Sequence, residues 1–187
     1  MKYLTDFVIP KKIFLTKGLG IHKEKLASFE LALRDAGIAH CNLVYTSSIF
    51  PPNAKLISRN AGLKLLSPGQ IIHVVMSKNV TNESNRLIAA AIGIAIPQEK
   101  KHYGYLSEHH AFGQTQDKAG EYAEDLAALM LATTMGFKNF DIDKSYDEKR
   151  ELWRILNKTV KTRNICQSAR GNKDGYWTYC IATAVMI

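Results

Sequence analysis

The eleven-residue apolar run from Leu87 to Pro97 (LIAAAIGIAIP) limits the possible folds of this chain more than any other segment. A bilayer span takes about 20 apolar residues, so no membrane span is predicted and the run must be buried inside the protein. Its alanines also fit a buried helix, but Gly93 and the closing proline disfavour a helix interior. Because three isoleucines alternate with small residues, the run predicts a buried strand.

Periodicity and turn residues divide the rest of the chain. We expect further strands over residues 7–16, 38–45, 71–76, 103–111 and 177–187. We expect helices over 22–36 and 118–135, capped by Gly37 and Gly136. The first helix should bury Leu26, Phe29 and Leu33, and the second Tyr122, Leu126, Leu129 and Met130.

The connecting segments carry turn signals. Gly18 and Gly20 predict a turn, and residues 53–70 predict a loop. The stretch 140–161 predicts a short strand, a turn, and a charged loop or helix. Together these elements indicate a single α+β domain over residues 1–187, with an antiparallel sheet core and two main helices.

Composition excludes several classes of protein. The 46% hydrophobic content is too high for disorder, and the N-terminal segment lacks the apolar stretch of a secretory signal, so we expect a cytoplasmic protein. The 25 Lys and Arg against 17 Asp and Glu give a net charge of +8. These cations are scattered, without a long basic run or interleaved aromatic residues, so we expect no nucleic-acid partner.

Common metal and nucleotide motifs are absent from the sequence. Cys41, Cys166 and Cys180 show neither a disulfide framework nor metal-ligand spacing. The neighbouring His109 and His110 would point to opposite faces of a strand, so they should not share a metal ion. No metal site is predicted.

The segment Ser47-Ser48-Ile49-Phe50-Pro51-Pro52 follows a predicted strand and ends in two prolines that cannot continue a strand ladder. A serine at such a turn could attack a neighbouring carbonyl group. By itself, a pair of serines at a strand end more often forms a turn that is hydrogen-bonded to its own backbone.

Several blocks of the chain together resemble the family of pyruvoyl-dependent arginine decarboxylases. The matching blocks are Phe29–Ile38, Asn42–Val44, Ser47–Pro52, Ala89–Pro97 and Gly104–Glu108, in the family's order and spacing. The resemblance implies a four-layer αββα sandwich with antiparallel sheets. It also implies a self-cleaving proenzyme that assembles as a homotrimer or a higher oligomer, with active sites between protomers.

The resemblance implies cleavage between Ser47 and Ser48, giving a β chain of residues 1–47 and an α chain of residues 48–187. Thr46 stands where an apolar residue is common, so a cut between Thr46 and Ser47 is the alternative. Ser48 would become a covalent pyruvoyl group, which forms a Schiff base with L-arginine and accepts the electrons released with CO2. The product would be agmatine; whether it serves polyamine biosynthesis, acid resistance or the consumption of arginine stays open.

Two further residues match the family's catalytic positions. Glu108 matches the proton donor, a role that requires a carboxyl kept protonated by an apolar surround such as Tyr105, Leu106, Ala111 and Phe112. Asn42 matches the asparagine that polarises the scissile carbonyl or holds the substrate carboxylate. Without the resemblance, Glu108 reads as a solvent-facing residue and Asn42 as a turn or strand-edge residue.

Recognition of a guanidinium requires a carboxylate. Glu30 occupies the matching position, where the family has an aspartate, so the side chain here is one methylene longer. Asp35 is the second candidate, and Ser47 would also line the site. Two alternatives stay open: decarboxylation of another amino acid on the same scaffold, or an unprocessed, non-catalytic oligomeric protein.

Overall fold

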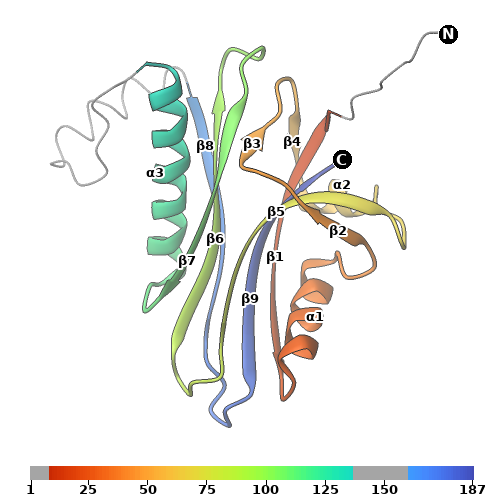
Figure 1. Ribbon diagram of the computed structural model, residues 1–187, viewed down its shortest axis with the longest axis vertical. Coiled ribbons are helices and arrows are strands. Elements are labelled where there is room, and N and C mark those ends of the chain that lie inside the picture. The colour runs from red at the N-terminus through yellow and green to blue at the C-terminus, as the bar shows by residue number, and fades with distance from the viewer. Residues whose placement is uncertain (1–8, 137–159) are drawn as a thin grey trace, which may run out of the picture.

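The computed structural model describes residues 9–136 and 160–187 (Figure 1). Within these residues the chain forms nine strands and three helices, arranged in two sheets. The five-stranded sheet has the order β2-β5-β9-β1-β4, and the four-stranded sheet has the order β3-β7-β6-β8. In chain order the elements are β1 (Lys12–His22), α1 (Lys25–Ala36), β2 (Asn42–Tyr45), β3 (Ile49–Phe50), β4 (Lys55–Ile57), α2 (Arg59–Leu63), β5 (Ile71–Thr81), β6 (Leu87–Pro97), β7 (Gly104–Phe112), α3 (Gln116–Thr134), β8 (Val160–Arg170) and β9 (Trp177–Met186).

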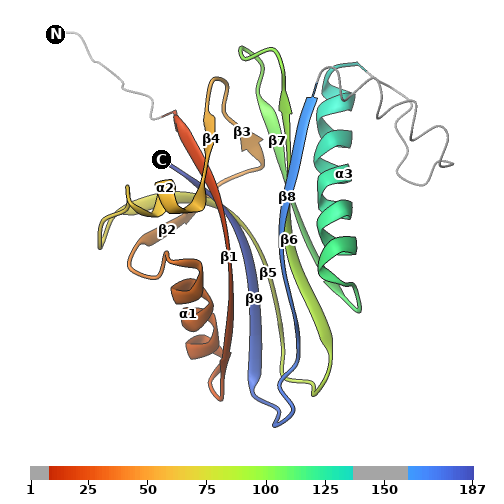
Figure 2. The ribbon, with the colours of Figure 1, turned by 180° about the vertical axis from the view of Figure 1, so that it is seen from behind.

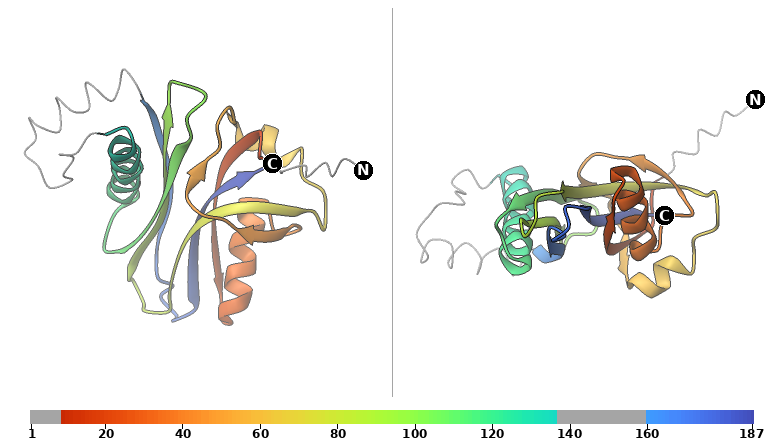
Figure 3. Two further views of the ribbon diagram at one scale, coloured as in Figure 1. Left: turned by 45° about the horizontal axis from the view of Figure 1, so that its top comes forward. Right: turned by 90° about the horizontal axis from the view of Figure 1, so that it is seen from below.

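The sheets pack face to face, and a helix covers each outer face. Helix α1 lies on the five-stranded sheet and α3 on the four-stranded sheet, so the layers run α, β, β, α (Figure 3). Most strand pairs are antiparallel, and only β1–β4 and β2–β5 are parallel. The α+β fold class predicted from the sequence is confirmed. None of the helices in the described ranges is long and apolar enough to cross a membrane.

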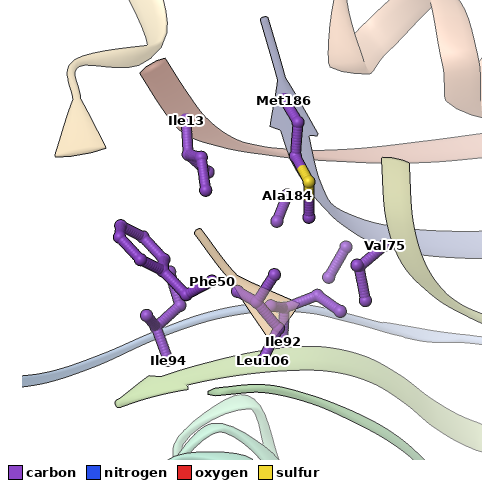
Figure 4. Packing of buried hydrophobic residues seen from close by; sticks show 9 residues of the cluster. Ile13, Phe50, Val75, Ile92, Ile94, Leu106, Ala184 and Met186 are labelled. Carbon is purple, nitrogen blue, oxygen red and sulfur yellow. The ribbon is translucent and has the colours of Figure 1, made fainter. Parts of the chain in front are cut away.

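The core lies between the sheets (Figure 4). Ile13, Val75 and Ala184 from the five-stranded sheet face Ile92 and Leu106 from the four-stranded sheet, and all five are fully buried. The apolar run is therefore a central strand, as predicted, because β6 pairs with β7 on one side and β8 on the other. Burial of this kind is the main favourable contribution to folding.

The prediction of a turn at Gly18 and Gly20 is wrong, since both glycines lie inside the continuous strand β1. A Cβ atom on Gly18 would stand 2.0 Å from the carbonyl oxygen of Ala32, and one on Gly20 would stand 1.9 Å from that of Ser28. The glycines thus let the backbone of α1 approach the strand. Gly37 ends that helix as predicted, with φ of 80°.

The predicted apolar face of α3 is also wrong. Tyr122 is 41% exposed, and the face that packs on the sheet is built of small residues. Its buried members are Ala119, Gly120, Ala123, Ala127, Ala128, Leu131 and Ala132. Small residues permit close packing, and the backbone of Ala123 would lie 2.0 Å from a Cβ on Gly93. The prediction followed the spacing of the large apolar side chains, whereas the helix packs on the sheet through its small ones.

Three more elements differ from the expectations. The predicted loop 53–70 contains β4 and α2, which Ser58 caps by accepting from the backbone N–H of Ala61. Leu26, expected inside, is 79% exposed. Strand β8 was not predicted. Most of the 140–161 prediction lies outside the described residues.

Candidate active site

The chain crosses from one sheet to the other at Ser47 and Ser48. Strand β2 pairs with β5 in the five-stranded sheet, and β3 pairs with β7 in the four-stranded sheet (Figure 1). Ser47 is exposed and Ser48 is half-buried. The two serines are therefore the link between two pinned strands, at the open side of the sandwich.

Backbone hydrogen bonds hold this link on both sides. The N–H of Thr46 donates to the carbonyl of Val74 (2.9 Å), and the N–H of Leu106 donates to the carbonyl of Ser48 (2.8 Å). Between them, the N–H of Ile49 donates to the carbonyl of Ser47 (2.9 Å), which closes a three-residue turn around Ser48. A donor on that carbonyl stabilises the negative charge that develops when a nucleophile attacks it.

Glu108 lies on β7, two residues beyond the one that holds the Ser48 carbonyl. Side chains alternate along a strand, so Glu108 points to the same side as Leu106, towards the five-stranded sheet. Ser107, between them, donates to the Ala123 carbonyl of α3 on the opposite face. The structure thus brings Glu108 to the same strand, and the same side, as the anchor of the Ser47–Ser48 link.

Partial burial raises the pKa of the Glu108 carboxyl, while Lys78 and His110 oppose that shift by their positive charge. The side chain still reaches solvent. The expected apolar surround is wrong in part, since Tyr105 packs under α3 on the other face of the strand. Desolvation at the sandwich edge, rather than a complete apolar pocket, therefore favours the protonated form.

Two buried polar residues that sequence reasoning missed fasten β7 at this point. Ser77 donates to the carbonyl of His109 (2.6 Å), and Asn79 donates to the carbonyl of Ala111 (2.9 Å). They are only 2% and 6% exposed. Both lie on β5, which runs to Thr81, five residues beyond the end of the predicted strand 71–76. The alternation of Val75, Ser77 and Asn79 could have revealed a strand with inward polar positions.

Lys78 interacts with Glu108 through its charge and also lies near the serine link. Its Nζ lies 5.1 Å from the ring centroid of Tyr45, two residues before Ser47. The hydroxyl of Tyr45 is in turn 3.4 Å from the sulfur of Met76. An ammonium group over an aromatic face is attracted by its quadrupole, which orients the lysine beside the site.

Asn42 lies at the far end of β2 from the serines. It stands three positions before Tyr45, roughly 10 Å at a rise of about 3.3 Å per residue. Its amide donates to the carbonyl of Gly69 (2.9 Å), so Ile49, rather than Asn42, supplies the donor on the Ser47 carbonyl. One protomer does not bring Asn42 to Ser48, and its catalytic role stays a prediction.

Glu30 lies on α1, against the outer face of the five-stranded sheet, so the sheet separates it from Glu108. The Nε of Arg34 donates to one of its carboxylate oxygens at 2.7 Å and lies 2.6 Å from the other. The Glu30 side chain is 43% exposed. The Glu30 carboxylate therefore binds a guanidinium group in this structure, and that group belongs to Arg34 of the same chain.

Asp35, the second candidate for substrate binding, has a structural contact. Its Oδ2 accepts a hydrogen bond from the backbone N–H of Leu19 (2.9 Å) on β1. The Asp35 carbonyl accepts a further bond from Arg59 (2.8 Å). This carboxylate thus fastens α1 to the sheet, and its binding of substrate remains a prediction.

The histidine pair points to opposite faces, as adjacent strand positions require. His109 stacks on Tyr122 of α3 at 4.4 Å and contacts Gln114 at 2.9 Å, whereas His110 influences Glu108 on the other side. In residues 9–136 and 160–187, no group of three His, Cys, Asp or Glu side chains converges as a metal site.

The geometry at Ser48 suits the formation of a covalent carbonyl group from the chain itself. That chemistry requires a serine hydroxyl beside a carbonyl that a hydrogen bond already polarises. Ser48 follows the Ser47 carbonyl, which accepts from Ile49. The residues present therefore fit a pyruvoyl group at position 48.

Comparison with known proteins agrees with this site. A model of the pyruvoyl-dependent arginine decarboxylase family matches residues 12–187. The chain is 57% identical over 180 residues to a pyruvoyl-dependent arginine decarboxylase of Nitrosopumilus maritimus (strain SCM1), covering 96% of this chain and 98% of that protein. It is 53% identical over 180 residues to pyruvoyl-dependent arginine decarboxylase 2 of Methanosarcina mazei, with the same coverage. A probable pyruvoyl-dependent arginine decarboxylase of Chloroherpeton thalassium is 57% identical over 179 residues, again covering 96% and 98% of the two chains.

Proposed function

Since the chain belongs to the family of pyruvoyl-dependent arginine decarboxylases, we propose that it is a cytoplasmic enzyme that converts L-arginine to agmatine and CO2. It cleaves itself between Ser47 and Ser48 and makes its pyruvoyl group from Ser48. The observation that carries this proposal is the hydrogen-bonded turn at Ser48, held by Leu106 two residues before Glu108.

The self-cleavage follows from the residues at the turn. The Ser48 hydroxyl attacks the Ser47 carbonyl carbon, and the Ile49 N–H stabilises the developing oxyanion. The peptide nitrogen then leaves, and an ester joins the two serines. Elimination then removes the Cα proton of Ser48, breaks its Cβ–O bond and releases the Ser47 carboxylate, and the dehydroalanine that remains tautomerises to an imine. Hydrolysis of the resulting imine consumes one water, releases ammonia and leaves the keto group.

The pyruvoyl group supplies the electron sink for decarboxylation. Glu108 then delivers a proton to the α-carbon of the substrate after CO2 has left. The raised pKa of this carboxyl supports that role, because a larger fraction of it stays protonated at working pH. Ser77 and Asn79 hold the strand on which Glu108 lies.

Glu30 binds the guanidinium of the substrate in this proposal. Its contact with the Arg34 guanidinium supports that chemistry, although the substrate must displace Arg34. Because Glu30 lies outside the five-stranded sheet, it serves the site of a neighbouring protomer. Asn42 is assigned to a neighbouring site because it lies at the far end of β2 from Ser48, where its amide donates to the carbonyl of Gly69. Shared sites require an oligomer, and we propose a homotrimer of cleaved protomers.

Intact mass under denaturing conditions tests the cleavage. We expect fragments of residues 1–47 and 48–187, with the larger fragment carrying a pyruvoyl group in place of serine. Ser48→Ala should give one uncleaved chain, and Ser84→Ala, which changes an exposed loop serine, should cleave normally. A break one residue earlier would support the Thr46/Ser47 alternative.

Product analysis with arginine, lysine and histidine tests the reaction. Arginine-dependent release of CO2 and agmatine is expected from the cleaved protein alone. Release from lysine or histidine instead would support the alternative of another amino acid. A single uncleaved wild-type chain without any product would overturn the proposal in favour of a non-catalytic protein.

A further inference from the structure

A cavity of about 520 Å³ opens at the end of the molecule where the β3–β4 turn, the β6–β7 connection and the start of β8 come together (Figure 2). Glu108 is not part of its wall, whereas the buried side chain of Phe50 is. Two apolar side chains and four basic ones form much of its wall. They are Phe50, Ile96, Lys55, Lys100, His102 and Lys161.

The charge of this cavity is one-sided. A smaller pocket of about 180 Å³ adjoins it, shares Ile96 and Lys161, and adds Arg163. The pairing of β8 with β6 sets Lys161 opposite Ile96 and Arg163 opposite Ile94, so both cations point between the sheets. Among residues 9–136 and 160–187, no Asp or Glu lines either pocket. The Glu99 carboxylate, on the β6–β7 connection, is 3.3 Å from His102.

In the part of the chain that the structure describes, these cations have no counter-charge, unlike several other Lys and Arg residues there. Within residues 9–136 and 160–187, the side chains of Lys55, Lys100, Lys161 and Arg163 make no hydrogen bond, ion pair or aromatic contact. Elsewhere, Lys17 donates to two oxygens, Arg34 pairs with Glu30, and Lys78 lies over Tyr45. Like charges around one cavity repel each other, and a bound anion would remove that cost.

We propose that this cavity binds a small polyvalent anion that carries phosphate or carboxylate groups. The lysines and Arg163 supply charged donors for the anionic oxygens. Phe50 and Ile96 supply an apolar wall for the rest of the ligand. The volume falls within the range of about 300 to 1,000 Å³ that is typical of small-molecule sites. Because the cavity is cationic, it cannot serve the guanidinium group of arginine, so this site is separate from the proposed active site.

The wall of the cavity includes the turn that follows the serine link. Phe50 and Pro51 lie two and three residues after Ser48, and the N–H of Asn53 donates to the carbonyl of Lys100 (3.1 Å). All these residues are in place in the uncleaved chain. The Ser48→Ala variant should therefore bind the anion, and this separates the proposal from the proposed catalytic function.

Calorimetric titration with inorganic pyrophosphate and, separately, with citrate tests the site at constant ionic strength. We expect saturable binding of at least one of them, one per chain, in both the wild type and Ser48→Ala. Lys100→Gln and Lys161→Gln should each weaken the affinity about tenfold, the effect of losing a charge-assisted hydrogen bond. Preference for pyrophosphate or for citrate identifies the ligand as a phosphate or a carboxylate.

Lys173→Gln is the matched control, because it removes the same charge from an exposed residue of the β8–β9 connection at the opposite end of the molecule (Figure 1). It should leave the affinity unchanged. The proposal is overturned if neither anion gives saturable binding, or if the control weakens binding as much as the cavity variants. Circular dichroism of each variant establishes that it is folded.

Discussion

The two long edges of the sandwich are closed by different side-chain chemistry. At the β5–β7 edge, the short neutral side chains of Ser77 and Asn79 donate to backbone carbonyls of β7. At the β1–β8 edge, one long cationic side chain, Lys17, donates to the carbonyl of Cys166 (2.9 Å) and to Gln116 (3.1 Å). The serine link and Glu108 lie only at the first edge.

This difference shows where precision is needed. Within the described residues, β7 pairs with β3 only at Gly104 and Tyr105, so the strand carrying Glu108 lacks a backbone partner on that side. The two buried donors reach β7 carbonyls that face β6, at His109 and Ala111, and so fix the backbone on both sides of His110 from above the sheet. A lysine with four rotatable bonds joins the sheets without fixing one geometry. We infer that the β5–β7 edge positions the backbone of β7, whereas the β1–β8 edge only holds the two sheets together.

Glu108→Gln should give the largest effect at the β5–β7 edge. Loss of a general acid reduces the rate by about 100- to 10,000-fold, so we expect kcat for arginine to fall by that factor. The amide keeps the shape of the carboxyl but cannot deliver its proton. Steady-state kinetics on fully cleaved protein measures the effect, and Glu83→Gln, at an exposed acid with only a 3.9 Å contact to Arg86, should be neutral.

The same substitution should not destabilise the fold at alkaline pH. A carboxyl whose folded pKa is raised contributes stability below its unfolded pKa, and that contribution is lost as the pH rises through the folded pKa. Above that window the wild type carries the cost of a partly buried charge, which glutamine lacks. Urea unfolding at pH 8 should find Glu108→Gln at least as stable as the wild type, and marked destabilisation would contradict a raised pKa.

Ser77→Ala should come next, with a fall in kcat of about tenfold. It removes a buried side-chain donor from the carbonyl of His109, which costs about 0.5 to 1.5 kcal/mol of unfolding free energy. Ser107→Ala is the matched control, because it removes a buried hydroxyl from β7 itself whose acceptor lies on α3. We expect both variants to lose similar stability and only Ser77→Ala to lose activity. Equal losses of kcat would mean that Ser77 contributes stability alone.

Lys78→Met should shift a pH profile while changing the maximal rate less. The lysine lowers the pKa of Glu108 against the effect of burial, so its removal should raise that pKa further. Glu108 then stays protonated to higher pH, and the alkaline limb of the plot of log kcat against pH should move to higher pH. Lys173→Met, remote from the site, should leave the pH of the alkaline limb unchanged. A shift of that limb to lower pH in Lys78→Met would refute the electrostatic role of Lys78.

The sequence predicted this molecule unevenly, for physical reasons. The run Leu87–Pro97 was correctly predicted as a buried strand. Isoleucine alternates with small residues along it, and both faces of the strand are buried. The α3 interface was mispredicted because alanine carries little hydrophobic signal, although it permits the closest packing. Gly18 and Gly20 were wrongly predicted to form a turn. Glycine is required there because the backbone of α1 packs directly against the strand, a contact that the local sequence does not reveal.

The site was predictable only where the chain itself carries the chemistry. The Ser47–Ser48 pair and Glu108 stand out by resemblance to a family, and the structure places them near one strand. Ser77 and Asn79 act through β7 backbone carbonyls 32 residues away, and such long-range acceptors leave no local pattern. Asn42 and Glu30 lie apart from Ser48 within one protomer, so a single chain does not test the roles predicted for them.

Lys17→Met should give the smallest effect and sharpen the contrast between the edges. It removes one ammonium group, which donates two hydrogen bonds at the β1–β8 edge, but keeps the length of the side chain, so we expect a loss of about 1 kcal/mol or less in unfolding free energy. Because this edge carries neither the serine link nor Glu108, kcat and the extent of cleavage should match the wild type. Denaturant unfolding and steady-state kinetics on one preparation measure both quantities. A fall in kcat as large as that of Ser77→Ala would mean that closing either edge sets the position of Glu108, and the division between a positioning edge and a cohesive edge would then be wrong.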